Sequence, residues 1–524
     1  MRVLFIVSVF MSACLPMYAQ VSSVDKLDAN NLNWQNRDPE KDKTAGTSVD
    51  KAYSTLLADK KPKKTIIVAV IDGGVDIDHE DLKEKIWVNE DEIPGNNIDD
   101  DKNGYVDDVH GWNFIGNAQG QNINEENVEY TRLVKDKNSP FYSEAKQLFD
   151  AEFEKRTQEK ASIEKFQLVY NRAKAIIKGA TNADVRSLED INKIQTKDPD
   201  ALRAIAFLKD RYENGFTEEI LQQIITQNNL WLQKRLNVNF NARAIVGDDP
   251  TNLNDRNYGN PDVKGPRANH GTSVAGVIAA VRNNNIGING IASDVKLMIL
   301  RSTPDGDERD KDVALAIKYA VDNGAHIINM SFGKQLSPQK AFVDEMVKYA
   351  DEKNVLLVHA AGNEGSDVDL KERYPSDRYL DGSEPKNWIG VGACGSKLND
   401  EVATVFSNYG KIHVDLFAPG EHIISTDTTN TYSENDGTSL AAPVVSGVAA
   451  LILSYYPDLT PSELISILMQ SSYKIDKKVM IPGRTEGERK KVKFSELSAS
   501  GGIVNAYEAL LLAQNGKPAQ GATR

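Results

Sequence analysis

Four short apolar runs constrain the fold of this 524-residue chain more than any other feature. They are TIIVAVID (65–72), AHIINMSF (325–332), VLLVHAAG (355–362) and HVDLFAPG (413–420). Such β-branched, apolar runs are typical of strands that are buried on both faces. Helical patterns lie between them, for example 312–324, where Gly324 is placed as a C-terminal stop. This alternation predicts an α/β fold with a doubly wound, mostly parallel sheet and helices on both faces.

The stretch 138–236 interrupts this alternation. It has almost no strand pattern, and its apolar residues recur at helical spacing, first at Ile163, Phe166, Tyr170, Ala173 and Ile177 and then at Leu221, Ile224, Ile225 and Leu232. Asp198 followed by Pro199 is a typical helix start, as is Thr217. We therefore predict an all-helical insertion of three or four helices, whose apolar stripes pack on one another or on the parent domain.

The first twenty residues indicate export. They carry one Arg, an apolar run and a small residue at the expected cleavage site, in the sequence MRVLFIVSVFMSACLPMYAQ. This pattern is typical of a secretory signal cleaved after Ala19. A lipoprotein signal with an acylated Cys14 is the alternative. We expect a secreted, periplasmic or envelope-associated protein without a transmembrane helix after signal removal, because no later apolar segment reaches the ~20 residues that such a helix needs. Only Cys394 remains after cleavage, which excludes an internal disulfide.

These patterns divide the chain into predicted segments. The signal peptide is 1–19 and an N-terminal extension is 20–64. The sheet-bearing domain comes in two parts, 65–137 and 237–513, around the helical insertion 138–236. A polar tail, 514–524, ends the chain.

The charge balance bears on the class of partner. The net charge is −14 and no long Lys/Arg cluster interrupts the acidic surface. Nucleic acids and anionic membrane surfaces are therefore not expected as partners, whereas cation binding by some of the carboxylates is.

Four residues with complementary chemistry stand at element ends. Asp72 ends a predicted strand, Asn363 follows another, and His270 and Ser439 each stand at the head of a small-residue helix. A serine at a helix start is usually only a cap, and a single histidine is usually structural. Together, however, an acid, a base, a hydroxyl and an amide donor are the groups that acyl transfer requires. The first N–H groups of a helix lack internal partners, so the N–H of Ser439 can face a developing oxyanion.

The same segments, in the same order, resemble the subtilisin-like serine proteases, or subtilases. The resemblance covers about 64–119 and 241–513 and leaves the helical insertion outside. It implies that Asp72 orients the imidazole, His270 is the general base and Ser439 is the nucleophile. Asn363 would donate into the oxyanion hole. It also implies that an extended polypeptide substrate pairs with the backbone of the segments holding Ser331, Phe332, Gly333 and Gly362.

Several positions depart from the family pattern. Gly73 stands where Ser or Thr is usual, Ser273 and Val444 replace common histidines, and Leu440 replaces a common methionine. None of these changes removes a catalytic part. The resemblance therefore implies an exported serine endopeptidase that needs no cofactor for catalysis. Two alternatives are a pseudo-protease that binds a partner through the helical insertion and an esterase-type hydrolase, although no Gly-x-Ser-x-Gly surrounds Ser439.

Two features remain outside the catalytic motifs. The stretch 20–64 looks too short for a folded inhibitory pro-domain, so we hypothesise that the helical insertion, or nothing in cis, takes over that folding or gating role.

The second feature is an acidic loop that contains Asp99, Asp101, Asn103, Gly104, Tyr105 and Asp107 at the spacing of the first nine positions of an EF-hand. This spacing predicts a structural Ca²⁺, with Asp99, Asp101, Asn103, Asp107 and the Tyr105 carbonyl as ligands. Position twelve is His110 rather than Glu, so the closing ligand comes from elsewhere, with Asp108 as one candidate. The alternative is a solvated acidic turn, which would repel itself without a cation.

Overall fold

The computed structural model describes residues 23–483 and 489–516. The predicted signal peptide, Cys14 and most of the predicted C-terminal tail lie outside these ranges. The described residues form two compact units: residues 125–241 form one, and residues 23–124 combine with those from 242 onward to form the other.

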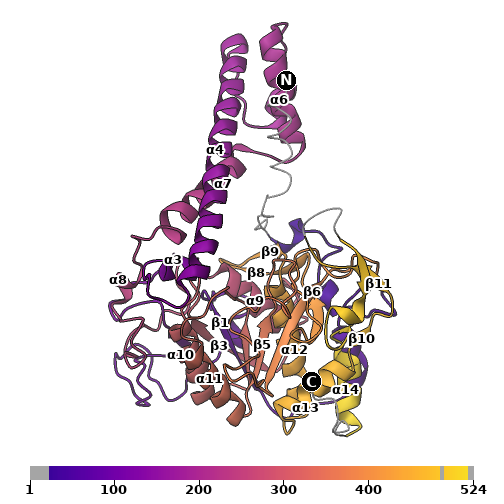
Figure 1. The fold of residues 1–524 in the computed structure, drawn as a ribbon. Helices are drawn as coiled ribbons and strands as arrows, with labels where there is room; N and C mark the ends of the chain where they lie inside the picture. The colour runs from indigo at the N-terminus through magenta and orange to yellow at the C-terminus, as the bar shows by residue number, and fades with distance from the viewer. Residues whose placement is uncertain (1–22, 484–488, 517–524) are drawn as a thin grey trace. The chain divides into compact units, whose positions relative to one another are not determined.

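A nine-stranded sheet forms the centre of the larger unit (Figure 1). Its order is β10-β13-β7-β6-β5-β4-β1-β3-β2, and every neighbouring pair is parallel except β10 with β13. The bounds are β1 Ile66–Asp72, β2 Gly111–Asn113, β3 Val295–Arg301, β4 Ile327–Met330, β5 Leu356–Ala360, β6 Trp388–Cys394, β7 Leu416–Pro419, β10 Tyr473–Lys474 and β13 Gly502–Ile503. The predicted α/β fold with a mostly parallel sheet is confirmed.

Two antiparallel hairpins accompany the sheet. In one, β8 (Ile423–Asp427) pairs with β9 (Thr431–Asn435), and in the other, β11 (Lys478–Met480) pairs with β12 (Lys491–Lys493). The short turns of helix in this unit are η1 Val24–Lys26, η2 Trp34–Asn36, α2 Val49–Lys51, η3 Ala52–Leu56, η4 Lys83–Lys85, α8 Arg243–Val246 and η6 Phe494–Glu496.

Six longer helices flank the sheet. They are α9 Asn269–Ala279, α10 Asp310–Asp322, α11 Lys340–Glu352, α12 Thr438–Tyr455, α13 Pro461–Gln470 and α14 Ala506–Gln514. Helix α12 contacts α9 and strands β4 to β7, while α10 and α11 contact each other. Within the described ranges, α12 is also the one helix with the length and apolar composition of a membrane span, but 94% of it is buried inside the protein. It is therefore the central core helix of this unit.

Residues 23–64 contribute to the core of the same unit. Trp34 is 1% exposed and its Nε1 donates to the carbonyls of Glu421 and His422. Val49 and Ala52 are fully buried in the same apolar cluster as the sheet. Backbone hydrogen bonds also tie this segment to residues 396 and 506. The predicted N-terminal extension is thus packed into the domain that follows it.

The second unit is helical. Its elements are α3 Glu129–Leu133, α4 Tyr142–Thr181, α5 Leu188–Asn192, α6 Pro199–Glu213, α7 Glu218–Leu230 and the π-helical turn η5 Trp231–Arg235. Asp198 and Thr217 accept hydrogen bonds from the first turns of α6 and α7, which confirms both predicted helix starts. The stripe Phe166, Tyr170 and Ile177 is buried against α6 and α7 in an apolar core of this unit. The predicted stripes therefore pack on one another.

Candidate active site

Asp72 and His270 form a close pair at the end of β1. Asp72 is 3% exposed, and His270 is the second residue of α9. His270 Nδ1 lies 2.9 Å from both carboxylate oxygens of Asp72. A carboxylate accepts hydrogen bonds, so Nδ1 carries a proton and Nε2 is left as the basic nitrogen of the neutral ring. The N–H of Gly73 also donates to Asp72 Oδ1, at 2.7 Å.

The residues after His270 explain how α9 reaches this position. A Cβ on Gly271 would lie 2.2 Å from the Gly74 carbonyl oxygen and 3.2 Å from Asp72 Cβ, so only glycine allows the helix to approach so closely. Thr272 Oγ1 accepts from the Asp76 N–H at 2.8 Å and donates to the Ala268 carbonyl at 2.6 Å. The His-Gly-Thr sequence therefore fixes the helix start against the loop after β1.

The pair shifts the pKa of His270. Partial removal of water from the ring would lower its pKa, but the charge and hydrogen bond of Asp72 raise it above the usual value of 6.5. The His270 side chain nevertheless remains 44% exposed, so the ring is accessible from solvent. A histidine of this kind can accept a proton from a nucleophile and holds it more firmly than an isolated imidazole does.

Ser439 and Asn363 meet around Gly437. Ser439 is the second residue of α12, and Asn363 follows β5. A Cβ built on Gly437 would lie 2.8 Å from Ser439 Oγ, 3.5 Å from Ser439 N and 3.6 Å from Asn363 Nδ2. These three atoms surround one small space beside the backbone. A carbonyl group placed there would have a nucleophile and two N–H donors within reach.

Thr438 fixes the orientation of Asn363. Asn363 Oδ1 accepts from the Thr438 N–H at 2.9 Å and from Thr438 Oγ1 at 3.0 Å. Because a backbone N–H only donates, the atom facing it is the amide oxygen. The amide nitrogen therefore lies on the other side, toward the space at Gly437.

The sheet order brings these groups to one edge. β1, β4 and β5 are neighbours, and Asp72, Ser331 and Asn363 stand at or beyond their carboxyl ends. Ser331 Oγ donates to the Ser439 carbonyl at 2.8 Å, which places the start of α12 over β4. Within residues 23–483 no hydrogen bond joins Ser439 Oγ to His270, so that contact stays a prediction. Catalytic hydrogen bonds are often long before substrate binds.

The residues expected to bind substrate differ in their surroundings. The Phe332 carbonyl accepts from His359 Nε2 at 2.9 Å, and burial lowers the pKa of His359 to about 4, so this imidazole is neutral at pH 7. The Gly362 N–H donates to Thr438 Oγ1 at 3.1 Å. The Phe332 carbonyl and the Gly362 N–H, which were expected to bind substrate, therefore already have hydrogen-bond partners within the protein. Ser331 is buried, while Gly333 is exposed.

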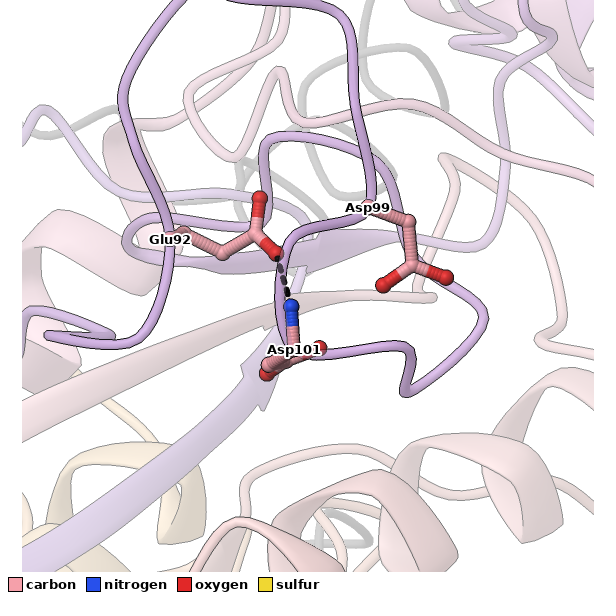
Figure 2. Close-up of side chains that lie close together, drawn as sticks. All are labelled: Glu92, Asp99 and Asp101. Atoms are coloured by element: carbon pink, nitrogen blue, oxygen red, sulfur yellow. Dashed lines mark hydrogen bonds between the residues drawn. The ribbon is translucent and has the colours of Figure 1, made fainter.

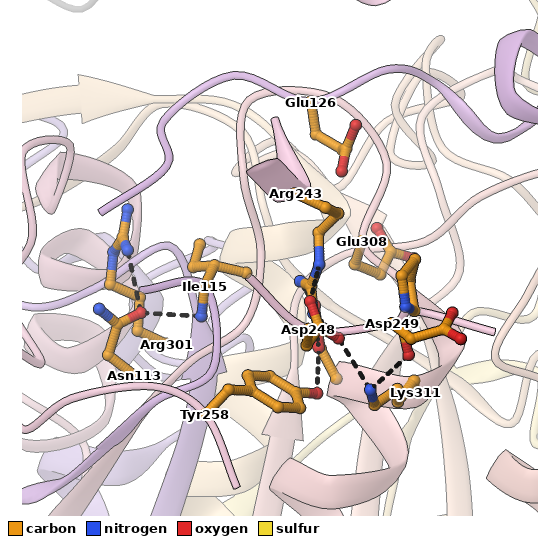
Figure 3. A network of polar contacts seen from close by, with 12 residues as sticks. Asn113, Ile115, Glu126, Arg243, Asp248, Asp249, Tyr258, Arg301, Glu308 and Lys311 are labelled. Carbon is orange, nitrogen blue, oxygen red and sulfur yellow. Dashed lines mark hydrogen bonds and ion pairs between the residues drawn. The ribbon is translucent and has the colours of Figure 1, made fainter. Parts of the chain in front are cut away.

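Arg301 is a residue near the site that the sequence analysis missed. It ends β3, directly opposite Asp72 in the sheet, and is 1% exposed. Its guanidinium donates to the carbonyls of Gly73 and Ile123. It also donates to Asn113 Oδ1 (Figure 3). Burial lowers its pKa to about 10, so the group stays charged at neutral pH. A charged residue directly after the apolar run Leu297–Leu300 was the available signal in the sequence.

The positions that depart from the family pattern have structural partners. Ser273 Oγ donates to the Thr426 carbonyl at 2.9 Å, which ties α9 to β8. Leu440 and Val444 are buried in the core of the larger unit. Gly73 has no side chain to bond Asp72, but its own N–H does so and its carbonyl is held by Arg301.

The acidic loop gathers three carboxylates, one of them unexpected. Ligand oxygens of Glu92, Asp99 and Asp101 all lie within 4.8 Å of one another (Figure 2). Glu92 is 5% exposed and its Oε1 accepts from the backbone N–H groups of Asp100 and Asp101. Three carboxylates this close repel one another, and carboxylate oxygens are the ligands that a hard cation prefers. This donor set therefore fits Ca²⁺.

The other predicted ligands have different partners. The Asp107 carboxylate accepts from the N–H groups of residues 95, 96 and 97. Asn103 Oδ1 accepts from the Tyr105 N–H, and Asn103 Nδ2 donates to Asp101 and Asp108. Asp108 also accepts from the Tyr319 hydroxyl. The carboxylate grouped with those of Asp99 and Asp101 is thus that of Glu92, which precedes the loop.

The chain is similar in sequence to known proteins. The model of the subtilase family matches residues 63–496. The chain is 39% identical over 187 residues to the thermophilic serine proteinase of Bacillus sp. strain AK1, over 36% of this chain and 43% of that protein. It is 36% identical over 232 residues to the major intracellular serine protease of Bacillus subtilis strain 168, over 43% of this chain and 69% of that protein.

A solved structure of proteases from Pseudoalteromonas arctica PAMC 21717 covers 92% of this chain and 98% of its own, at 19% identity and a TM-score of 0.47. The match to the proteinase of strain AK1 spans less than half of that protein. The family model, by contrast, covers most of the present chain, and the motifs at Asp72, His270, Asn363 and Ser439 fall inside it. The resemblance seen in the sequence is confirmed: the chain belongs to the subtilase family.

Proposed function

We propose that this protein is an exported serine endopeptidase that cleaves polypeptides through an acyl-enzyme. The observation that carries the proposal is the convergence of Ser439 Oγ, Ser439 N and Asn363 Nδ2 on the space at Gly437. The Asp72–His270 pair at the same edge of the sheet supports it. Export rests on the N-terminal sequence alone.

In the first half-reaction, Ser439 Oγ attacks the carbonyl carbon of the scissile peptide bond. His270 Nε2 takes the hydroxyl proton, and Asp72 keeps the Nδ1 proton in place and stabilises the imidazolium. The negative charge on the carbonyl oxygen is met by the Ser439 N–H and the Asn363 amide. One such donor typically contributes a factor of ~10²–10³ to turnover.

The intermediate then collapses. His270 gives its proton to the leaving amine, the C–N bond breaks, and the acyl group stays on Ser439 Oγ. In the second half-reaction water attacks the ester, with His270 again as general base, and the acid product leaves. The substrate backbone would lie extended beside residues 331–333, where the backbone of Ser331 and Gly333 would pair with it.

We further propose that Glu92, Asp99 and Asp101 hold a structural Ca²⁺. The proximity of the three carboxylates supports this assignment. The ion would neutralise their charges and brace the loop between β1 and β2. It would supply no chemistry to the catalytic step.

An active-serine phosphonate probe tests the proposed activity. We expect wild-type protein to be labelled and to cleave a mixed peptide library, and Ser439→Ala to do neither. Ser454→Ala is the matched control, because Ser454 is a buried serine of the same helix whose hydroxyl donates to the Leu451 carbonyl. A well-folded wild type that is never labelled would favour the alternative of a binding module.

A further inference from the structure

Helix α12 contains a proline that disrupts the hydrogen bonding of its first turn. In an α-helix, each carbonyl accepts from the N–H four residues later. The residue four positions after Ser439 is Pro443, which has no N–H. The carbonyl of Ser439, at the base of the candidate active site, therefore lacks the partner that the residue four positions later usually supplies. A buried carbonyl in this situation needs a donor from elsewhere.

Ser331 provides that donor. Its Oγ lies 2.8 Å from the Ser439 carbonyl oxygen, and the residue is 6% exposed. Because a carbonyl only accepts, the single hydroxyl proton of Ser331 is committed to this bond. Ser331 Oγ must then act as acceptor toward its other neighbour.

That neighbour is Asn329, two residues earlier on β4. Asn329 Nδ2 donates to Ser331 Oγ at 2.9 Å, and Asn329 Oδ1 accepts from Ser446 Oγ at 2.8 Å. Asn329 and Ser446 are both 0% exposed. Ser446 lies seven positions after Ser439, on the same face of α12. The three side chains thus form a one-directional polar chain that leaves α12 at Ser446, crosses β4 and returns to α12 at Ser439.

We propose that Ser331, Asn329 and Ser446 are positioning residues that set the orientation of the nucleophile in the reaction proposed above. The polar chain clamps the first turn of α12 to the sheet instead of to the next turn of its own helix. Pro443 makes this possible by freeing the Ser439 carbonyl. The side chains of the three residues touch no reacting atom, and they act through the backbone that carries Ser439 Oγ and its N–H.

The effect falls on the chemical step and not on substrate affinity. A misplacement of about 1 Å at a reacting group can cost a factor of ~10² in rate. We expect Ser331→Ala to lower kcat by about 10- to 100-fold with KM changed less than threefold, and to slow phosphonate labelling equally. Ser446→Ala should act in the same direction with a smaller effect, since it removes the far end of the chain. The control Ser454→Ala should leave kcat unchanged.

Pro443→Ala separates positioning from ordinary stability. It supplies an N–H that can bond the Ser439 carbonyl within the helix, so Ser331 should become less important in that background. We expect Ser331→Ala to lower kcat at least fivefold less in Pro443→Ala than in wild type. Thermal unfolding of all variants is measured alongside, because a purely structural role would lower the unfolding temperature without this coupling in kcat.

Each outcome decides the question. Turnover by wild type with an undiminished kcat in Ser331→Ala overturns the inference and leaves the proposed function intact. Equal losses from Ser331→Ala in both backgrounds also overturn it. A folded wild type without turnover or labelling overturns the proposed function and, with it, this inference. Loss in kcat that is relieved by Pro443→Ala supports both.

Discussion

Gly437→Ala is the substitution that tests the geometry of the candidate site most directly. Gly437 is buried, and its φ of 156° belongs to a conformation that residues with a side chain rarely adopt. The added methyl carbon would lie 2.8 Å from Ser439 Oγ, which is closer than Cβ atoms ordinarily approach another atom. It would fill the space in which we place the substrate carbonyl.

The magnitude follows from what the methyl group blocks. Attack requires the carbonyl carbon of the substrate to come within about 3–3.5 Å of Ser439 Oγ. The added methyl carbon would occupy the space beside Ser439 Oγ that the carbonyl carbon needs. The same group lies between the two N–H donors, each of which contributes a factor of ~10²–10³. Loss of both donors gives at least ~10⁴, so we expect kcat/KM to fall by at least this factor. Backbone strain adds a stability cost of about 1–3 kcal/mol.

The assay must distinguish a loss of catalytic activity from a loss of folded protein. We would measure peptide hydrolysis and phosphonate labelling beside thermal unfolding. Gly382→Ala is the matched control: its φ of 84° makes the backbone cost comparable, yet no atom lies within 4 Å of the added carbon. We expect both variants to lose a few degrees of unfolding temperature and only Gly437→Ala to lose activity. A folded Gly437→Ala enzyme within tenfold of wild type would refute the proposed oxyanion site.

Three further predictions follow from other contacts. Asp72→Asn should lower kcat by ~10⁴ and, because Asp72 raises the pKa of His270 above 6.5, should move the acid limb of the kcat/KM profile to lower pH; an unmoved limb would contradict this. For the acidic loop, removal of Ca²⁺ by a chelator should lower the unfolding temperature of wild type but not of Glu92→Gln, and an equal response of both would exclude Glu92 as a ligand. Arg243 and Asp312, 3% and 1% exposed, form a buried ion pair at 2.7 Å. Arg243 also pairs with Asp248 (Figure 3). Asp312→Ala should therefore cost about 3–5 kcal/mol in chemical denaturation, and a loss below 1 kcal/mol would contradict the pairing.

The sign of the His270 shift also sets how its ionisation affects stability. The pKa is raised in the folded state, so the protonated ring binds Asp72 better than it would in the unfolded chain. This contribution is complete below the unfolded value of about 6.5 and disappears as pH rises through the folded value. The proposed mechanism requires the neutral ring, so we expect activity to rise over the pH range in which the stabilisation is lost.

The fold could be predicted because the central strands of the sheet are buried on both faces. Such strands are largely apolar, and β1, β4, β5 and β7 stand out in the sequence without knowledge of their partners. The ends of parallel strands share one edge, which is why Asp72 and Asn363 could be assigned to one site. Short strands such as β2 and β13 carry too few residues to show a pattern.

Residues whose partners are distant in sequence could not be predicted. The partner of Ser331 is the carbonyl of Ser439, 108 residues away, and what frees that carbonyl is Pro443. The sequence at a strand end gives no sign of such a bond, so the segment 331–333 was assigned only backbone contacts with substrate. Glu92 is close in sequence and was missed for a different reason, because the EF-hand spacing directs attention to residues after Asp99.

The position of residues 23–64 changes how regulation should be understood. An inhibitory pro-segment has to leave the enzyme, yet Trp34 is 1% exposed and lies in the main apolar cluster with Val49 and Ala52. Burial of a Trp side chain removes about 150–250 Å² from water, worth roughly 4–6 kcal/mol at 25 cal/mol per Å². Loss of this segment would therefore cost a large part of the stability of an ordinary domain. We therefore expect the segment to remain in the folded unit of the active protein, which is consistent with the hypothesis that the helical insertion, or nothing in cis, takes over a gating role.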